Sequence, residues 1–173
     1  MLFRSEKMYP FIIKRKHLRE RWRELNVLII DEISMLTAEL FDKIEAIARK
    51  IRYKFNKPFG GIQLVCSGDF FQLPPIGISS GNSEFCFQTV NWDKCIPREN
   101  VIILTEIIRQ EDKLFANALA KIRVGNIDSS VKDIFSTTIG AESKDDDIKP
   151  TRLYPLNSCV DYINEKEFGK ARS

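Results

Sequence analysis

The spacing of apolar residues changes several times along the chain, and each change predicts a new element. Residues 27–30 form a continuous apolar run, which is typical of a strand buried on both faces of a parallel sheet. Residues 37–53 then carry apolar positions three or four apart, which predicts an amphipathic helix. A Pro-Phe-Gly-Gly sequence at 58–61 ends that helix, and residues 62–67 predict a second buried strand. Strand, helix and strand in this order predict an α/β fold, with helices flanking a parallel sheet.

The other predicted elements extend the same pattern. Residues 11–25 predict a basic helix, 69–100 a loop-rich stretch, and 101–105 a third strand. A helix at 111–123 is closed by Gly125 at the C′ position, where glycine tolerates a left-handed backbone. Residues 144–149 read as an acidic surface linker, and 151–154 as a strand. Ser158 is predicted to cap a terminal helix.

Two carboxylates, Asp31 and Glu32, follow the first apolar run directly. Acids at the carboxyl end of such a strand lie where open α/β sheets bind ligands. This is the Walker B arrangement, in which the first acid holds the Mg²⁺ of a nucleotide and the second orients or deprotonates the attacking water. A core strand that ends in two solvated acids is the alternative.

The second predicted strand leads into a similar turn. Residues 68–75 read Gly-Asp-Phe-Phe-Gln-Leu-Pro-Pro, which places Asp69 and Gln72 at the same end of the sheet as Asp31. A glutamine amide can donate to a γ-phosphate oxygen and accept from the attacking water. The alternative is an ordinary strand-to-turn transition, but the whole octapeptide after a Walker B segment is more specific than either piece.

A complete nucleotide site also needs a Gly-x-x-x-x-Gly-Lys-[Ser/Thr] loop, whose backbone N–H groups hold the phosphates. The only Gly-Lys pair, Gly169-Lys170, is followed by Ala171 and has Asn164 where the first glycine belongs. The sequence therefore contains half of a phosphate site.

Composition narrows the class of protein without identifying it. The chain has 173 residues, 43% hydrophobic and 29% charged, which is typical of a globular domain. Its net charge is only +3, but basic residues cluster at 1–26 and 43–57, where they can neutralise phosphates or simply form solvated helix faces. Four cysteines without metal-ligand spacing favour a reduced intracellular setting, and no apolar run is long enough for a signal peptide or a membrane span.

The motifs together resemble the Pif-one-like DNA helicases of superfamily one, which are related to the RecD group. The resemblance covers nearly the whole chain. It is carried by residues 28–35, 40–51, 57–64, 68–75, 85–87, 104–110 and 151–157, with Val160, Ile163 and Asn164.

The resemblance implies a role for each matching site residue. Asp31 is expected to hold Mg²⁺, Glu32 to activate water, and Gln72 to sense the γ-phosphate of ATP with support from Asp69. Arg109 matches the family arginine that reaches the γ-phosphate. That role suits a guanidinium, which is always charged and forked toward phosphate oxygens.

The resemblance also implies a partial RecA-like fold. Residues 1–145 correspond to the carboxyl-terminal part of the first motor domain, and 146–173 to the start of the second. The parent protein is expected to be a monomeric ATP-dependent 5′-to-3′ helicase that acts on single-stranded DNA and duplex junctions. It would serve DNA repair, recombination, the response to DNA damage and telomere maintenance, in the nucleus or mitochondrion of a eukaryote and without membrane attachment.

Because the phosphate loop is missing, we expect the chain to be a fragment that is inactive alone. A non-catalytic nucleic-acid-binding remnant is the first alternative, with Phe59, Phe70 or Phe71 stacking on bases, although these phenylalanines also fit a core. A different P-loop ATPase that shares only the Walker B segment is the second, and the Phe-Phe-Gln-Leu-Pro-Pro block argues against it.

Overall fold

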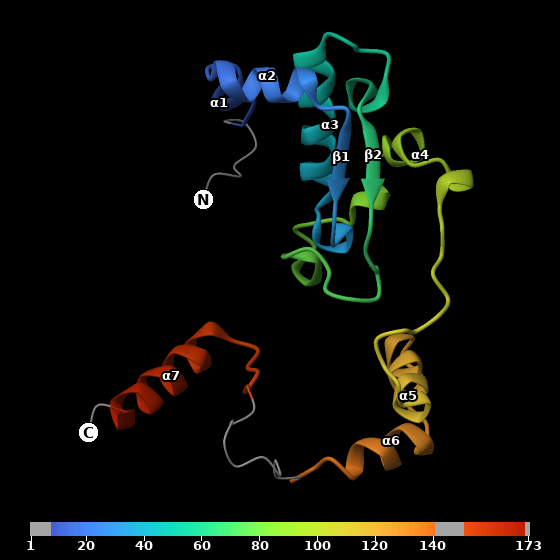
Figure 1. Cartoon of the computed structure of the whole chain (residues 1–173), viewed down its shortest axis with the longest axis vertical. Helices are drawn as coiled ribbons and strands as arrows, with labels where there is room; N and C mark the ends of the chain where they lie inside the picture. The colour runs from blue at the N-terminus through green and yellow to red at the C-terminus, as the bar shows by residue number, and fades with distance from the viewer. Residues whose placement is uncertain (1–7, 141–150, 172–173) are drawn as a thin grey trace. The chain divides into compact units, whose positions relative to one another are not determined.

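The computed structural model describes residues 8–140 and 151–171. The chain divides into two compact units, Met1–Ile127 and Asp128–Ser173, which are described separately (Figure 1). None of the helices in the described part of the chain is both long and apolar enough to cross a membrane.

A two-stranded parallel sheet lies at the centre of the first unit. Strand β1 (Val27–Ile30) pairs with β2 (Gln63–Cys66), with Val27 opposite Gln63 and Ile30 opposite Cys66. Helix α3 (Ala38–Arg52) connects the two strands and packs beside them (Figure 1). The predicted strands, the connecting helix and the α/β class with a parallel sheet flanked by helices are therefore confirmed.

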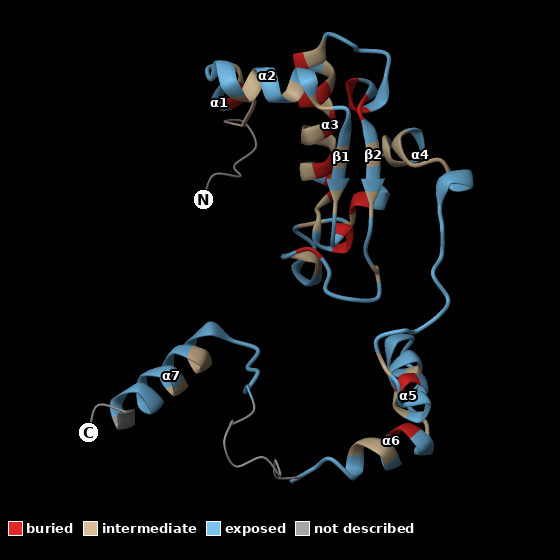
Figure 2. Ribbon diagram, viewed as in Figure 1, coloured by how far each residue is buried: buried red, intermediate tan, exposed pale blue. Residues whose placement is uncertain are grey.

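The sheet buries one face rather than two. Leu28, Ile30, Leu64 and Cys66 pack against the core, although Figure 2 draws much of both strands as exposed. The side chains between them alternate outward, and Ile29 remains 69% exposed. The prediction of strands buried on both faces is wrong here, because the described helices cover only one side of this sheet.

The core forms where α3 meets the sheet and the turn after the helix. Phe41 and Phe59 are fully or almost fully buried, and their rings meet edge to face at 5.4 Å. Thr37 caps α3 by accepting a hydrogen bond from the Leu40 N–H at 3.1 Å. Tyr53 ends the helix in a left-handed conformation, with φ 55°.

Two helices, rather than the predicted one, precede the sheet. Helices α1 (Met8–Ile13) and α2 (Lys16–Glu24) are separated because Arg15 has an extended backbone. Ile12 of α1 packs with Ile47 and Ile51 of α3 in a second apolar cluster.

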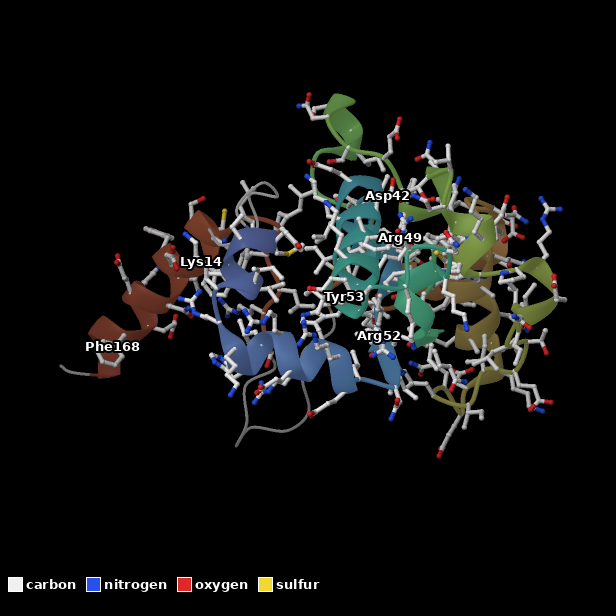
Figure 3. All side chains as sticks on the ribbon, turned by 90° about the horizontal axis from the view of Figure 1, so that it is seen from above. Lys14, Asp42, Arg49, Arg52, Tyr53 and Phe168 are labelled. Atoms are coloured by element: carbon white, nitrogen blue, oxygen red, sulfur yellow. The ribbon has the colours of Figure 1, made fainter. Side chains whose placement is uncertain are left out.

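Two charged residues of α3 have structural partners. Glu45 is only 3% exposed and accepts from the Phe59 N–H at 3.2 Å and from Arg49 Nε at 2.9 Å. Arg52 donates to the Gly60 carbonyl at 2.9 Å, and its Nη1 lies 2.7–3.1 Å from three carbonyl oxygens around the end of α2. Figure 3 labels Arg49 and Arg52 on α3. These arginines of the basic cluster at 43–57 therefore hold the fold together.

Short helices fill the stretch after β1 and the loop-rich stretch after β2. These are η2 (Ile33–Met35), η3 (Pro58–Gly61), η4 (Ile78–Ser80), η5 (Cys86–Gln88), α4 (Trp92–Cys95) and η6 (Arg98–Asn100). Helix α5 (Lys113–Arg123) follows, and Gly125 closes it with φ 76°, as predicted. The predicted strand at 101–105 is wrong, because this segment pairs with no described strand and Ile102, Ile103 and Leu104 are 80–89% exposed.

The second unit contains α6 (Ser129–Ser136) and α7 (Asn157–Ala171). The predicted terminal helix is confirmed, but it begins at Asn157, so Ser158 lies inside it rather than at its cap. The predicted strand at 151–154 is wrong, since these residues pair with no other described segment. The predicted linker at 144–149 and the domain boundary at 145/146 lie outside the described residues.

Candidate nucleotide site

The carboxyl ends of β1 and β2 bring the predicted acidic residues to one edge of the sheet. The strands are parallel and Ile30 lies opposite Cys66, so the next residues, Asp31 and Ser67, lie opposite each other where the strands end. The pairing continues past the strands, where the Ile33 N–H donates to the Ser67 carbonyl at 3.0 Å. The two strands therefore end at the same edge of the sheet, as expected, and the roles of Asp31, Glu32, Asp69 and Gln72 at that edge stay a prediction.

Asp31 is held as a carboxylate by two hydrogen bonds. Its Oδ1 accepts from Ser67 Oγ at 2.6 Å and from the Glu32 N–H at 2.9 Å. The Ser67 bond, followed by the backbone bond, lowers the pKa of Asp31 from its ordinary value. An exposed, ionised carboxylate is a hard oxygen ligand of the kind that suits Mg²⁺.

The described residues contain no group of three or more His, Cys, Asp or Glu side chains that could hold a metal ion. Mg²⁺ often needs only one or two protein carboxylates, because substrate phosphates and water complete its coordination. The donor set around Asp31 therefore fits Mg²⁺ bound together with a nucleotide and does not fit a metal cage made by the protein alone.

Glu32 adopts an unusual backbone conformation. Its φ of 51° and ψ of 46° lie in the left-handed region, which costs a residue with a side chain about 1–3 kcal/mol. Glu32 is exposed. Its carboxylate forms no hydrogen bond within the part of the chain that the structure describes, so its oxygens are free to accept a hydrogen bond from solvent or a ligand.

A close approach between the two turns requires glycine at position 68. A Cβ atom there would lie 2.9 Å from the Ile33 backbone nitrogen and 3.0 Å from Ile33 Cγ2. Both distances are too short, so any side chain at this position would push the turn after β2 away from the turn after β1.

Asp69 is the most extensively bonded acid of the site. Its Oδ1 accepts from the Phe71 N–H at 3.0 Å, and its Oδ2 accepts from Gln72 Nε2 at 3.2 Å. Arg123, at the end of α5, donates from Nε to Oδ2 at 2.8 Å and from Nη2 to Oδ1 at 2.7 Å. The Arg123 guanidinium, more than the loop N–H groups, holds the pKa of Asp69 far below its usual range.

Arg123 is absent from the set of site residues predicted from the sequence. It lies 54 positions after Asp69, and it resembles any basic residue in the last turn of a helix. No spacing rule connects the two. The one sequence signal that could have pointed to Arg123 was a basic residue in the last turn of the helix that follows Arg109.

The structure leaves Arg109 apart from this bonded group. It is exposed in a segment without regular secondary structure, and among the described contacts none links it to Asp31, Glu32, Asp69 or Gln72. Its role in contacting a phosphate stays a prediction.

The three phenylalanines considered for base stacking differ in exposure. Phe59 is buried in the core, and Phe70 meets Phe87 edge to face at 4.9 Å. Phe71 is 63% exposed. The Cζ atom of the Arg123 guanidinium lies over its ring, 4.7 Å from the ring centroid. Phe59 and Phe70 therefore serve packing, and of these three only Phe71 has a largely exposed side chain.

Comparisons with known proteins support the motif assignment. A family model described as PIF1-like helicase matches residues 3–133. The chain is 48% identical over 164 residues to uncharacterized protein 030L of Invertebrate iridescent virus 6, and 43% identical over 155 residues to the ATP-dependent DNA helicase PIF1 of Xenopus laevis. Each match covers 90% of this chain, but only 31% and 24% of the respective relative.

Solved structures agree on the fold. The Pif1 helicase of Candida albicans superposes with a TM-score of 0.84 at 38% identity, covering 95% of this chain and 36% of that one. A Bacteroides Pif1 helicase, crystallised with ADP-AlF3 and single-stranded DNA, gives 0.71 at 29% identity, covering 90% of this chain and 38% of its own. This likeness supports a partial RecA-like fold for the chain. The chain, which spans about a quarter to a third of these relatives, belongs to the PIF1-like helicase family.

Proposed function

We propose that the chain is the carboxyl-terminal part of the first RecA-like domain, residues 1–145, with the start of the second, residues 146–173, of an ATP-dependent 5′-to-3′ DNA helicase. The observation that carries this proposal is the shared sheet edge, where Asp31 and Glu32 follow β1 while Asp69 and Gln72 follow β2. One edge thus carries a metal-binding carboxylate, a free carboxylate and an amide, which are the groups that phosphoryl transfer to water requires.

Each residue has a distinct chemical task in this proposal. Asp31, kept ionised by Ser67, would bind the Mg²⁺ that accompanies ATP. Glu32, whose carboxylate is free, would orient the attacking water and take its proton. Gln72 would contact the γ-phosphate and the water through its amide, and Arg109 would stabilise the charge that develops on the phosphate.

The proposed partners are single-stranded DNA and duplex junctions. One solved relative was crystallised with single-stranded DNA, which supports the first of these for the family. We further propose that the parent helicase acts as a monomer in DNA repair, recombination and telomere maintenance, and, if its cell is eukaryotic, in the nucleus or mitochondrion.

The decisive experiment compares the 173-residue chain with a chimera in which a PIF1-like relative supplies the phosphate loop and the rest of the second domain. The short chain should show no ATP turnover, since positioning of the phosphates is nearly the whole of phosphoryl-transfer catalysis. The chimera should hydrolyse ATP in the presence of DNA.

Glu32→Gln in the chimera should lower kcat by about 100-fold or more with little change in KM, because it removes a group used mainly in the transition state. Glu39→Gln, at an exposed position of α3 outside the proposed site, is the matched control and should leave kcat unchanged. An active chimera in which Glu32→Gln is as fast as Glu39→Gln would overturn the role of Glu32. Salt-dependent DNA binding by a chimera that never hydrolyses ATP would favour the non-catalytic alternative.

A further inference from the structure

We propose that Arg123 is a positioning residue for ATP hydrolysis, which fixes the amide of Gln72 by holding the carboxylate of Asp69. This inference rests on the proposed function and adds to it a residue from α5, outside the motifs that carry the resemblance. Arg123 acts through Asp69, so it is not itself a catalytic residue.

The first support is the geometry of the contact. The planar guanidinium meets the carboxylate with two parallel hydrogen bonds of 2.8 and 2.7 Å. Such a bidentate pair fixes the plane of the carboxylate as well as its position. The same guanidinium covers the ring of Phe71, so Arg123 contacts the loop at two of its residues.

The second support is the set of donors that the two carboxylate oxygens of Asp69 bind. Each carboxylate oxygen takes one bond from Arg123 and one from the loop: Oδ1 from the Phe71 N–H and Oδ2 from Gln72 Nε2. An ionised carboxylate can only accept, so the nitrogen of the Gln72 amide must face Asp69. The Gln72 carbonyl oxygen then points away from Asp69, where it can accept a hydrogen bond from water.

Without this constraint the amide of Gln72 can rotate by half a turn. Gln72 is exposed, and its side chain has no other hydrogen bond within the described residues. A rotated amide would offer a donor where the attacking water needs an acceptor. Holding the carboxylate therefore selects the productive orientation of the amide and removes a competing one.

The third support is that Arg123 projects from a well-defined helix end. Asp112 caps the start of α5 by accepting from the Leu114 N–H at 2.8 Å. At the other end, the Gly125 N–H donates to the Ile122 carbonyl and the Asn126 N–H to the Lys121 carbonyl, each at 2.9 Å. Both ends of the helix are thus capped, which defines the last helical turn, from which Arg123 projects.

The test uses two measurements. In the active chimera, Arg123→Ala should lower kcat for ATP by about 10- to 100-fold while KM changes by less than about twofold. Arg123→Lys should recover little, because an ammonium group cannot make the paired bonds. Lys113→Ala, an exposed change at the start of the same helix, is the matched control and should keep full activity.

The second measurement does not depend on activity. Carbon-13 NMR titration of Asp69 in the 173-residue chain should show a strongly lowered pKa, which returns toward the usual aspartate range in Arg123→Ala and stays low in Lys113→Ala. An unchanged Asp69 titration in Arg123→Ala, with a folded spectrum, would overturn the contact. An active chimera with full kcat in Arg123→Ala would overturn the positioning role alone. A chimera with no ATPase at all would instead overturn the proposed function, and the positioning role with it.

Discussion

The hydroxyl of Ser67 donates a 2.6 Å hydrogen bond to Asp31 Oδ1, and this bond joins the ends of the two parallel strands. It connects a residue after β2 with a residue after β1, beside the backbone hydrogen bonds that Ser67 makes with Ile30 and Ile33. The charged form of Asp31 is therefore prepared by the fold before any ligand arrives, which reduces the reorganisation that binding requires.

Ser67→Ala should raise the pKa of Asp31 toward its ordinary value and weaken Mg²⁺ binding. The hydroxyl is the main cause of the lowered pKa, and the Glu32 N–H alone holds the charge less well. Carbon-13 NMR titration of Asp31 checks the first effect and Mg²⁺ titration of the chimera with nucleotide the second. Ser34→Ala is the control, because the Ser34 hydroxyl is buried without a described partner. An Asp31 titration that is unchanged in Ser67→Ala would contradict this assignment.

The stability of the chain should fall in acid through Asp31 and Asp69. Both carboxyls have lowered pKa values in the folded state, so the unfolded chain binds more protons below about pH 4. Their stabilising contribution is complete above that pH and is lost as pH falls toward the folded-state pKa values. Urea unfolding from pH 7 to pH 2 measures the effect. Asp69→Asn should flatten the acid limb, and an equally steep limb in that variant would exclude Asp69 as a cause.

Glu45→Ala should destabilise the first unit by about 2–4 kcal/mol, because it leaves the buried Phe59 N–H and the Arg49 guanidinium without their shared acceptor. Glu45→Gln should cost less, since its amide oxygen can still accept from Phe59. Glu39→Ala removes a carboxylate that is paired with Lys43 on the same helix but is 75% exposed, so we expect less than about 0.5 kcal/mol. Urea denaturation ranks the three variants, and equal losses for Glu45→Ala and Glu39→Ala would refute the buried role.

Gly68→Ala should cost about 1–3 kcal/mol, the usual range for overpacking, because the new methyl group would meet the Ile33 backbone. It should also weaken the Ser67–Asp31 bond, since Ser67 is its neighbour, and this would show as a raised pKa of Asp31. Gly169→Ala introduces a methyl group with no atom within 4 Å and without a positive φ, so it should change stability by no more than about 1 kcal/mol. Thermal unfolding and NMR titration of both variants measure these effects.

Local patterns predicted much of the first unit. The strands β1 and β2 and helix α3 follow from strong periodicity and from the Pro58 turn, which act within a few residues. The segment 101–105 has an equally apolar pattern, but a strand also needs a hydrogen-bonded neighbour, and none of the described strands pairs with it. Side-chain pattern alone does not reveal whether that neighbour is present.

Site residues could be predicted where they follow a strand end closely in the sequence. They could not be predicted where they lie on a distant helix. Asp31, Glu32, Asp69 and Gln72 follow predicted strands directly, so their common edge could be expected. Arg123 reaches Asp69 across 54 residues. Glu45 and Arg52 looked like charges on a solvated helix face, because helical spacing describes a helix's own faces and not the backbone groups that pack against them.

The bonds of Arg52 have a consequence for the order in which the chain folds. The carbonyl oxygens that it binds at Trp22, Arg23 and Leu25 belong to residues 27–30 positions earlier in the chain. Closing so long a loop costs more entropy than forming a turn of helix, and on a ribosome the earlier residues emerge first. The end of α2 must therefore wait, unanchored, until α3 has been synthesised and has wound to its last turn. The amino-terminal helices can therefore gain these three bonds, and the packing of Ile12 on Ile47 and Ile51, only after α3 has formed.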